Sequence, residues 1–463
     1  MTTSVSISTP TDRELSRRLL LLAGPVIATN ASRTVMSFVD FFMVSGLGTK
    51  AQAAVSPATL VVFCPIVFGM GMMSAVNTFA AQSFGRERKA DCAAYAWQGI
   101  YLSLLLGTLV LPGWFLIEPL FASAGADADI IEMQVIYTEI CLWSIAPSII
   151  SLALSNFFTA IHRPSVGLFA MVVSNVVNLA GNYVLIYGKL GFPELGIAGS
   201  AWATLGASVL QALILLAVFL APAYRREFQS WRVRRLDSAR LMALLRVGTP
   251  VAVLSASDIV TWTLFTIYLV GHFGEVQLAA HNICIKWLEI SFMPALGVGM
   301  ALTAMVGKMI GEHKHDVARR AARVGAFFII TYMVSVGLVF AAFGKHLANI
   351  LSIVDDPQVI YWASRLLILY AFFQFFDALH IAYAGALRGA GDNTWPAVVW
   401  VICALTFLLG GGWLMTNLRP QWGLLAPWSA CIFYVCVLGT VMWARWRFGP
   451  WERIELLDTL PAT

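Results

Sequence analysis

Three aspartates stand inside long apolar stretches of this 463-residue chain. Asp40 lies in SFVDFFMV, Asp258 in SASDIVTW and Asp377 in QFFDALHIAY. A charged side chain at the centre of a bilayer costs about 2.5–3.5 kcal/mol on insertion scales, so such residues usually bind ions or substrates. Each of the three is therefore a candidate site of cation or proton chemistry.

Asp40 is the strongest of these candidates. Asn178 and Asn182 are four residues apart, which places both on one face of a helix. A carboxylate beside amide oxygens can hold a proton in one state and Na⁺ in another, and Pro25 upstream could kink the helix that carries Asp40. Two simpler interpretations of these residues are also possible: a salt bridge between Asp40 and Arg33, and ordinary interhelical hydrogen bonding by Asn178 and Asn182.

Asp377 has polar neighbours at helical spacing. Gln374 precedes it and His380 follows it by three residues, so the three share a face that could line a cavity and relay a proton. Phe376 and Tyr383 are the aromatic candidates for lining the same cavity. The alternative for His380 is a structural hydrogen bond.

The remaining intramembrane charges favour structural roles. Lys286 and Glu289 stand three residues apart and are expected to neutralise each other on one helix face, whereas Asp258 is a third buried acid, in the seventh stretch. The seven cysteines form no CxxC pair and no Cys/His metal spacing. We expect no disulfide framework, no cofactor, and no metal other than Na⁺ at Asp40.

The elements that must position these residues are membrane-spanning helices. Of the residues, 59% are hydrophobic and only 12% are charged, about half the share of a soluble domain. Twelve apolar stretches are long enough to cross a bilayer, which predicts an all-α polytopic membrane protein. They cover about 18–44, 53–83, 93–118, 131–160, 166–188, 196–222, 247–271, 278–307, 320–343, 358–387, 395–416 and 423–444.

The loops between these stretches alternate in charge. Those after the even-numbered stretches carry most of the Lys and Arg, including seven arginines in 223–246, and the opposite loops are acidic or sparse. By the positive-inside rule both termini face the cytoplasm, and the expected location is the inner (plasma) membrane. We expect the first stretch to be retained as a helix rather than cleaved as a signal peptide.

The two halves of the chain repeat each other at an offset near 226. FFMVSGLG at 41–48 aligns with IYLVGHFG at 267–274, and Gly85 aligns with Gly311. Each half has six spans, which predicts two six-helix bundles related by a pseudo-twofold axis along the membrane normal, with a substrate cavity between them. The predicted parts are a tail 1–17, an N-lobe 18–222, a basic linker 223–246, a C-lobe 247–444 and a tail 445–463.

Four segments together resemble the multidrug and toxic compound extrusion (MATE) family, in its bacterial NorM-like or DinF-like branch. They are GPVIATNASRTVMSFVDFFMVSGLG, NLAGNYVLIYGKLGFPELGIAGSAWAT, AAHNICIKWLEISFMPALGVGMALTAMVGKMIGE and ALRGAGDNTWP. The resemblance implies a twelve-helix antiporter that exports organic cations and other amphipathic compounds in exchange for H⁺ or Na⁺.

The resemblance also implies roles for single residues. Asp40 falls on the family's first-helix acid, Asn178 and Asn182 on polar positions of its N-lobe cation site, and Asp377 on the tenth-helix acid. At the position of the seventh-helix glutamate this chain has Ile259, with Asp258 one residue away and therefore about 100° around the helix. Coupling through Asp40 is favoured for this reason.

The resulting hypothesis is a monomeric antiporter that works by alternating access. A proton or Na⁺ at Asp40 would weaken the site for a cationic substrate, by loss of charge attraction and by a bend at Pro25. The alternative is a lipid-linked precursor flippase, although a flippase that binds pyrophosphate substrates should have Arg and Lys side chains in its interior cavity. A major-facilitator transporter is a weaker alternative. No HExxH, GxSxG or Walker motif predicts an enzyme, and the dispersed net charge of +5 argues against nucleic-acid binding.

Overall fold

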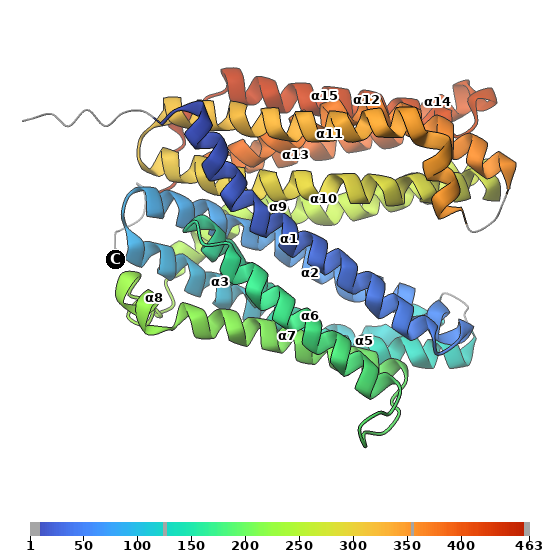
Figure 1. Cartoon of the computed structure of the whole chain (residues 1–463), viewed down its shortest axis with the longest axis horizontal. Coiled ribbons are helices and arrows are strands. Elements are labelled where there is room, and N and C mark those ends of the chain that lie inside the picture. The colour runs from blue at the N-terminus through green and yellow to red at the C-terminus, as the bar shows by residue number, and fades with distance from the viewer. Residues whose placement is uncertain (1–9, 124–126, 353–355, 458–463) are drawn as a thin grey trace, which may run out of the picture. The chain divides into compact units, whose positions relative to one another are not determined.

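The computed structural model describes residues 10–123, 127–352 and 356–457, and within these ranges all regular structure is helical (Figure 1). In the first half of the chain the helices are α1 (Asp12–Ser45), α2 (Thr49–Gly85), α3 (Lys89–Val110), η1 (Leu111–Gly113), α4 (Trp114–Ala122), α5 (Ala128–Ala160), α6 (Ser165–Ile186), α7 (Ile197–Phe219) and α8 (Pro222–Glu227). In the second half they are α9 (Ser238–Leu264), η2 (Phe265–Val270), η3 (Gly271–Phe273), α10 (Glu275–Gly311), α11 (His315–Leu351), α12 (Pro357–Ala390), α13 (Thr394–Cys403), η4 (Ala404–Gly410), α14 (Gly411–Leu418), η5 (Pro420–Trp422), α15 (Leu425–Phe448) and η6 (Trp451–Arg453).

Twelve of these helical segments are long and apolar enough to span a membrane, and each coincides with one predicted stretch. The all-α, twelve-span fold class is thus confirmed. The first helix begins at Asp12 and the seventh span at Ser238, so both extend further toward the N-terminus than the apolar stretches alone indicated. Residues 1–9 of the predicted N-terminal tail and 458–463 of the C-terminal tail lie outside the described ranges.

The chain divides into two compact units. The N-unit comprises residues 28–260 with 456–457, and the C-unit comprises 10–27 with 261–455. The divisions fall inside α1 and α9, so the first turns of α1 belong to the C-unit whereas its second half, with Asp40, belongs to the N-unit. The lobe limits at 222 and 247 stay a prediction.

In the N-unit α5 is the central helix. It packs against α2, α3 and α7, and α6 in turn lies along α7 (Figure 1). Small residues permit close packing here: a Cβ on Gly107 would lie 2.4 Å from the Cβ of Ala146 on α5. Dispersion between closely packed helices, rather than expulsion of water, holds such bundles together in lipid.

In the C-unit α12 has the corresponding central place. It packs against α10, α11 and α15, which run alongside it (Figure 1). Gly385 and Gly389 are one turn apart on α12, and a Cβ at either would lie under 3.0 Å from a carbonyl oxygen of α10, at Gly299 and Thr303 respectively. The Thr303 hydroxyl donates to the Gly385 carbonyl at 2.8 Å, which fixes the register of the two helices.

The repeat seen in the sequence extends to the backbone. Gly48 and Gly274, which are 226 residues apart, precede α2 and α10 with φ of 109° and 93°. Glu87 and His313, also 226 apart, have φ of 59° and 57° although neither is glycine. Equivalent strained turns at one constant offset show that the two halves share local structure as well as sequence.

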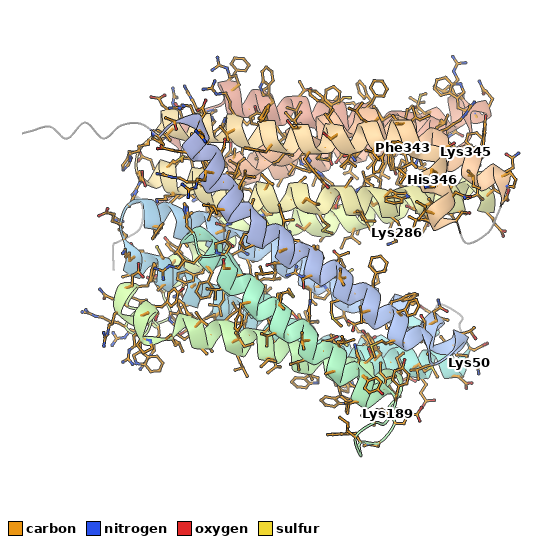
Figure 2. The ribbon with its side chains drawn as sticks, in the orientation of Figure 1. Lys50, Lys189, Lys286, Phe343, Lys345 and His346 are labelled. Carbon is orange, nitrogen blue, oxygen red and sulfur yellow. The ribbon has the colours of Figure 1, made fainter. Side chains whose placement is uncertain are left out.

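The second half of the chain also contains local distortions. Two spans include π-helical turns, η2 and η4, which in other proteins often mark functional positions. In α11 the backbone leaves helical geometry at Phe343, and Lys345 and His346 follow this kink in the same region of Figure 2.

Candidate functional site

Asp40 lies in the second half of α1, where that helix runs along α6. The Nδ2 group of Asn175 donates to the Ser32 hydroxyl at 2.8 Å, and the Tyr187 hydroxyl donates to the Met43 carbonyl at 2.9 Å. Between these two contacts Asn182 donates to a carboxylate oxygen of Asp40. The paired positions rise together along both helices, so the two segments are parallel and the acid faces the asparagine side of α6.

A chain of polar groups continues from Asp40 across α6 to α7. The amide nitrogen of Asn182 also donates to Asn178 Oδ1 at 3.1 Å, and the amide nitrogen of Asn178 lies 3.5 Å from the Thr204 hydroxyl. Asn178 and Asn182 are almost completely buried, and Asp40 is half-buried. The structure therefore brings together the three residues that the sequence grouped, and it adds Thr204.

One oxygen in this group has no hydrogen-bond partner. Asn182 Oδ1 is buried and unsatisfied, which is costly for a polar atom unless a ligand or water completes its shell. Carboxylate, amide and hydroxyl oxygens are the hard donors that Na⁺ and similar cations prefer, and a carboxylate can alternatively take up a proton. The cluster is thus chemically suited to one small cation.

No basic side chain within the described ranges lies within salt-bridge distance of Asp40, and the alternative of an Arg33 salt bridge is wrong. Arg33 is exposed, and although seven residues place it on nearly the same face of α1 as Asp40, they also separate the two by about two turns, or roughly 10 Å, along the helix axis. Tyr137 and Cys141 of α5 are close enough to Asp40 for its charge to act on them. Neither was found from the sequence, since no local pattern links α5 to α1.

The second acid, Asp377, is buried in α12. His380 Nδ1 lies 3.4 Å from its carboxylate, a long hydrogen bond at best, which requires the proton to sit on Nδ1. Gln374 does not bond to Asp377; its amide nitrogen donates instead to the Ser291 hydroxyl of α10 at 2.8 Å. The predicted polar stripe therefore exists, but its members have separate partners.

The aromatic candidates near Asp377 differ in their surroundings. Tyr383 is buried, whereas Phe376 is half-buried and packs edge-on against Phe375. Asp258 is half-buried on the part of α9 that belongs to the N-unit, whereas Asp377 belongs to the C-unit. A role for Asp258 in cation binding stays a prediction.

A buried histidine that the sequence analysis did not single out lies in the C-unit. Trp428 Nε1 donates to His281 Nδ1 at 3.3 Å, and His281 Nε2 lies 3.0 Å from the Thr266 hydroxyl in η2. Because Nδ1 accepts, the proton of the neutral ring must be on Nε2. Phe265 and Trp428 pack around the ring, with centroid separations of 6.2 and 5.5 Å.

The expected pairing of Lys286 with Glu289 is confirmed. Their charged groups are 3.0 Å apart on α10, and both side chains are about half exposed. All seven cysteines are free thiols. Across the described part of the chain, no group of three or more His, Cys, Asp and Glu residues has the arrangement of a metal site.

Twelve apolar helices within the described ranges, an internal repeat and a half-buried acid held by an amide are typical of a multi-pass membrane transporter. The MatE family model matches residues 25–184 and again 252–411, one copy in each half. The chain belongs to the MatE family.

Known relatives agree with this assignment. The chain is 31% identical over 390 residues to a probable multidrug resistance protein NorM of Rhizobium meliloti (strain 1021), covering 83% of each chain. It is also 31% identical over 395 residues to a protein of the same description from Mesorhizobium japonicum, covering 83% of this chain and 84% of the relative. A solved outward-facing multidrug resistance MATE family transporter shares the fold, with a TM-score of 0.86 at 20% identity over 95% of this chain and 97% of that one.

Proposed function

We propose that this protein is a secondary active antiporter that exports organic cations and other amphipathic compounds in exchange for H⁺ or Na⁺. Family membership and relatives described as multidrug resistance proteins support the export of small molecules. The observation that carries the coupling is the Asp40 carboxylate, half-buried in a spanning helix with one amide donor, Asn182, and no basic partner among the described residues. A negative charge left without a counter-ion in lipid favours uptake of a proton or a cation.

In this mechanism Asp40 alternates between two occupants. A coupling ion held by Asp40, Asn182 and Asn178 would remove the negative charge that attracts a cationic substrate. Export requires that ion and substrate differ in affinity between inward- and outward-facing states, since equal affinities shift no equilibrium. Pro25, inside α1 upstream of Asp40, is the proposed point of bending.

The site chemistry also separates this proposal from the lipid-linked precursor flippase. A pyrophosphate substrate needs clustered guanidinium or ammonium groups. The groups linked to Asp40 by hydrogen bonds are the amides of Asn182 and Asn178 and the Thr204 hydroxyl instead, which favours a cationic substrate. We further propose an inner-membrane location with both termini in the cytoplasm, and neither a cofactor nor catalysis.

The test is efflux of a fluorescent organic cation from inverted membrane vesicles, with proton and sodium gradients imposed separately. We expect Asp40→Asn to lose gradient-driven transport, and the matched control Asp127→Asn, at an exposed acid before α5, to keep it. Undiminished efflux by Asp40→Asn would overturn the assignment. Reduced efflux by Asp377→Asn would add the second acid to the pathway, and hydrolysis of any nucleotide during transport would contradict secondary coupling.

A further inference from the structure

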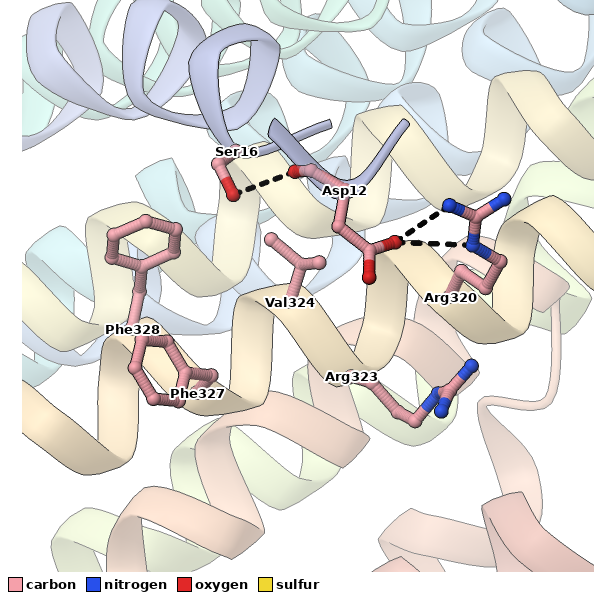
Figure 3. Close-up of a pocket in the computed structure, with 7 residues that line it drawn as sticks. All are labelled: Asp12, Ser16, Arg320, Arg323, Val324, Phe327 and Phe328. Carbon is pink, nitrogen blue, oxygen red and sulfur yellow. Dashed lines mark hydrogen bonds and ion pairs between the residues drawn. The ribbon is translucent and has the colours of Figure 1, made fainter. Parts of the chain in front are cut away.

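A cavity of about 300 Å³ lies in the C-unit between the start of α1 and the first turns of α11. Its lining combines charged and apolar side chains: Asp12, Ser16, Arg320, Arg323, Val324, Phe327 and Phe328 (Figure 3). Both helices are spanning segments that begin here, so the cavity is at the boundary between lipid and water. We propose that it binds the headgroup phosphate of an anionic phospholipid.

The charged side of the cavity is partly neutralised by the protein itself. Arg320 donates twice to a single carboxylate oxygen of Asp12, at 3.1 and 2.7 Å. The Ser16 hydroxyl donates to the Asp12 carbonyl at 2.8 Å within the first turn of α1, and the Arg320 pair joins this turn to α11. Arg323 adds a second guanidinium, and within the described residues no carboxylate forms an ion pair with it. One positive charge of the lining is therefore left for an anion.

The surrounding sequence favours an anionic over a zwitterionic headgroup. Segments 12–18 and 316–323 together contain six arginines but only three acidic residues. Basic clusters at the membrane boundary attract anionic lipids, and guanidinium groups suit phosphate oxygens in particular.

The apolar side of the cavity argues for a lipid rather than free phosphate. Phe327 and Phe328 lie one turn beyond Arg323 and Val324, and Figure 3 shows the two rings on the side away from the arginines. Phe327 is 65% exposed, and Leu20, one turn after Ser16 on α1, is 49% exposed. Each helix thus begins with charged groups, and exposed apolar groups follow within one turn. This order matches a phospholipid, in which a charged phosphate is joined to apolar acyl chains. A cavity of this volume holds the headgroup alone, and the chains lie along the helices outside it.

The test uses the purified full-length protein in detergent micelles and a phosphatidylglycerol that carries a photoreactive group. We expect crosslinks to peptides that contain residues 12–16 and 320–328, competed by unlabelled phosphatidylglycerol. Arg323→Gln removes a guanidinium that forms no ion pair with a described carboxylate, so it is expected to fold normally and to bind about fivefold more weakly. Arg319→Gln is the matched control, because Arg319 pairs with Glu452 at 2.6 Å and does not line the cavity.

Each alternative gives a different result. Equal weakening by Arg319→Gln and Arg323→Gln would reduce the effect to general surface charge and overturn the site. Equal competition by phosphatidylethanolamine would overturn the anionic preference. Equal competition by inorganic phosphate or by soluble glycerophosphate would replace the lipid with a free phosphate ligand.

Discussion

Replacement of Arg240 should destabilise the protein far more than replacement of any neighbouring arginine of the basic linker. Arg240 lies in the first turn of α9, and its guanidinium is 2.9 Å from the Asp91 carboxylate of α3. Both side chains are nearly inaccessible, at 5% and 6% exposure, and Arg240 also pairs with Asp237. Removing one partner of a buried ion pair typically costs about 3–5 kcal/mol because the other charge stays buried.

Arg240→Gln is therefore expected to lower the free energy of unfolding by about 3 kcal/mol, roughly a hundredfold in the unfolding equilibrium constant. The measurement is equilibrium unfolding of purified protein in micelles by a denaturing detergent. Arg232→Gln is the matched control, since Arg232 is exposed in the same linker, and a change below about 0.5 kcal/mol is expected.

A double-mutant cycle then isolates the pair. Asp91→Asn alone should also destabilise, whereas Asp91→Asn with Arg240→Gln leaves no buried charge of this pair and should recover most of the loss. A coupling energy near zero, or an Arg240→Gln variant as stable as Arg232→Gln, would refute the reasoning that the linker is fastened by this buried contact.

Four further results are expected. Burial alone would raise the pKa of Asp237, but the backbone N–H, the charge and the side chain of Arg240 outweigh burial and lower this pKa below its ordinary value. The ionised Asp237 therefore stabilises the fold above about pH 4, and this stabilisation is lost on further acidification. In Asp237→Asn, a pH titration of the unfolding free energy should lack this component. Gly385→Leu should lower the thermal midpoint strongly by forcing α10 and α12 apart, while Gly206→Leu, with open space around its Cα, should not. His281→Phe should destabilise by about 1–3 kcal/mol, because it leaves a buried indole N–H without an acceptor, and an unchanged thermal midpoint would contradict the hydrogen bond. Lys286→Met should change the unfolding free energy by less than about 1 kcal/mol, because its ion pair is exposed, and a larger loss would indicate a role in the buried structure.

Much of the fold followed from the sequence because the bilayer constrains it so strongly. Every backbone polar group in the membrane must be satisfied internally, so apolar stretches of this length have to be helices. Boundaries were less accurate where a helix continues beyond the membrane: α1 starts at Asp12 and α9 at Ser238, among charged residues that hydropathy assigns to tails and linkers. Internal distortions such as η2 and the kink at Phe343 lie in mainly apolar sequence without a local proline, so hydropathy does not predict them.

Part of the candidate site around Asp40 could also be predicted, because some of its features depend on single helices. Helical periodicity placed Asn178 and Asn182 on one face, and the rarity of membrane acids singled out Asp40. The contribution of α5, through Tyr137 and Cys141, and that of α7, through Thr204, depend on helix packing and could not be inferred from spacing along the chain.

By itself the sequence determined which segments cross the membrane, that these segments repeat, and which of their residues are polar enough to be candidates for a functional site. These properties depend on composition and on periodicity along single helices. Only the tertiary structure decided the partners: Asn182 rather than Arg33 for Asp40, Asp91 for Arg240, and Asp12 for Arg320 across 308 residues. Such pairings depend on the rotation and packing of helices distant in sequence, because side chains of different helices meet only when whole faces pack together.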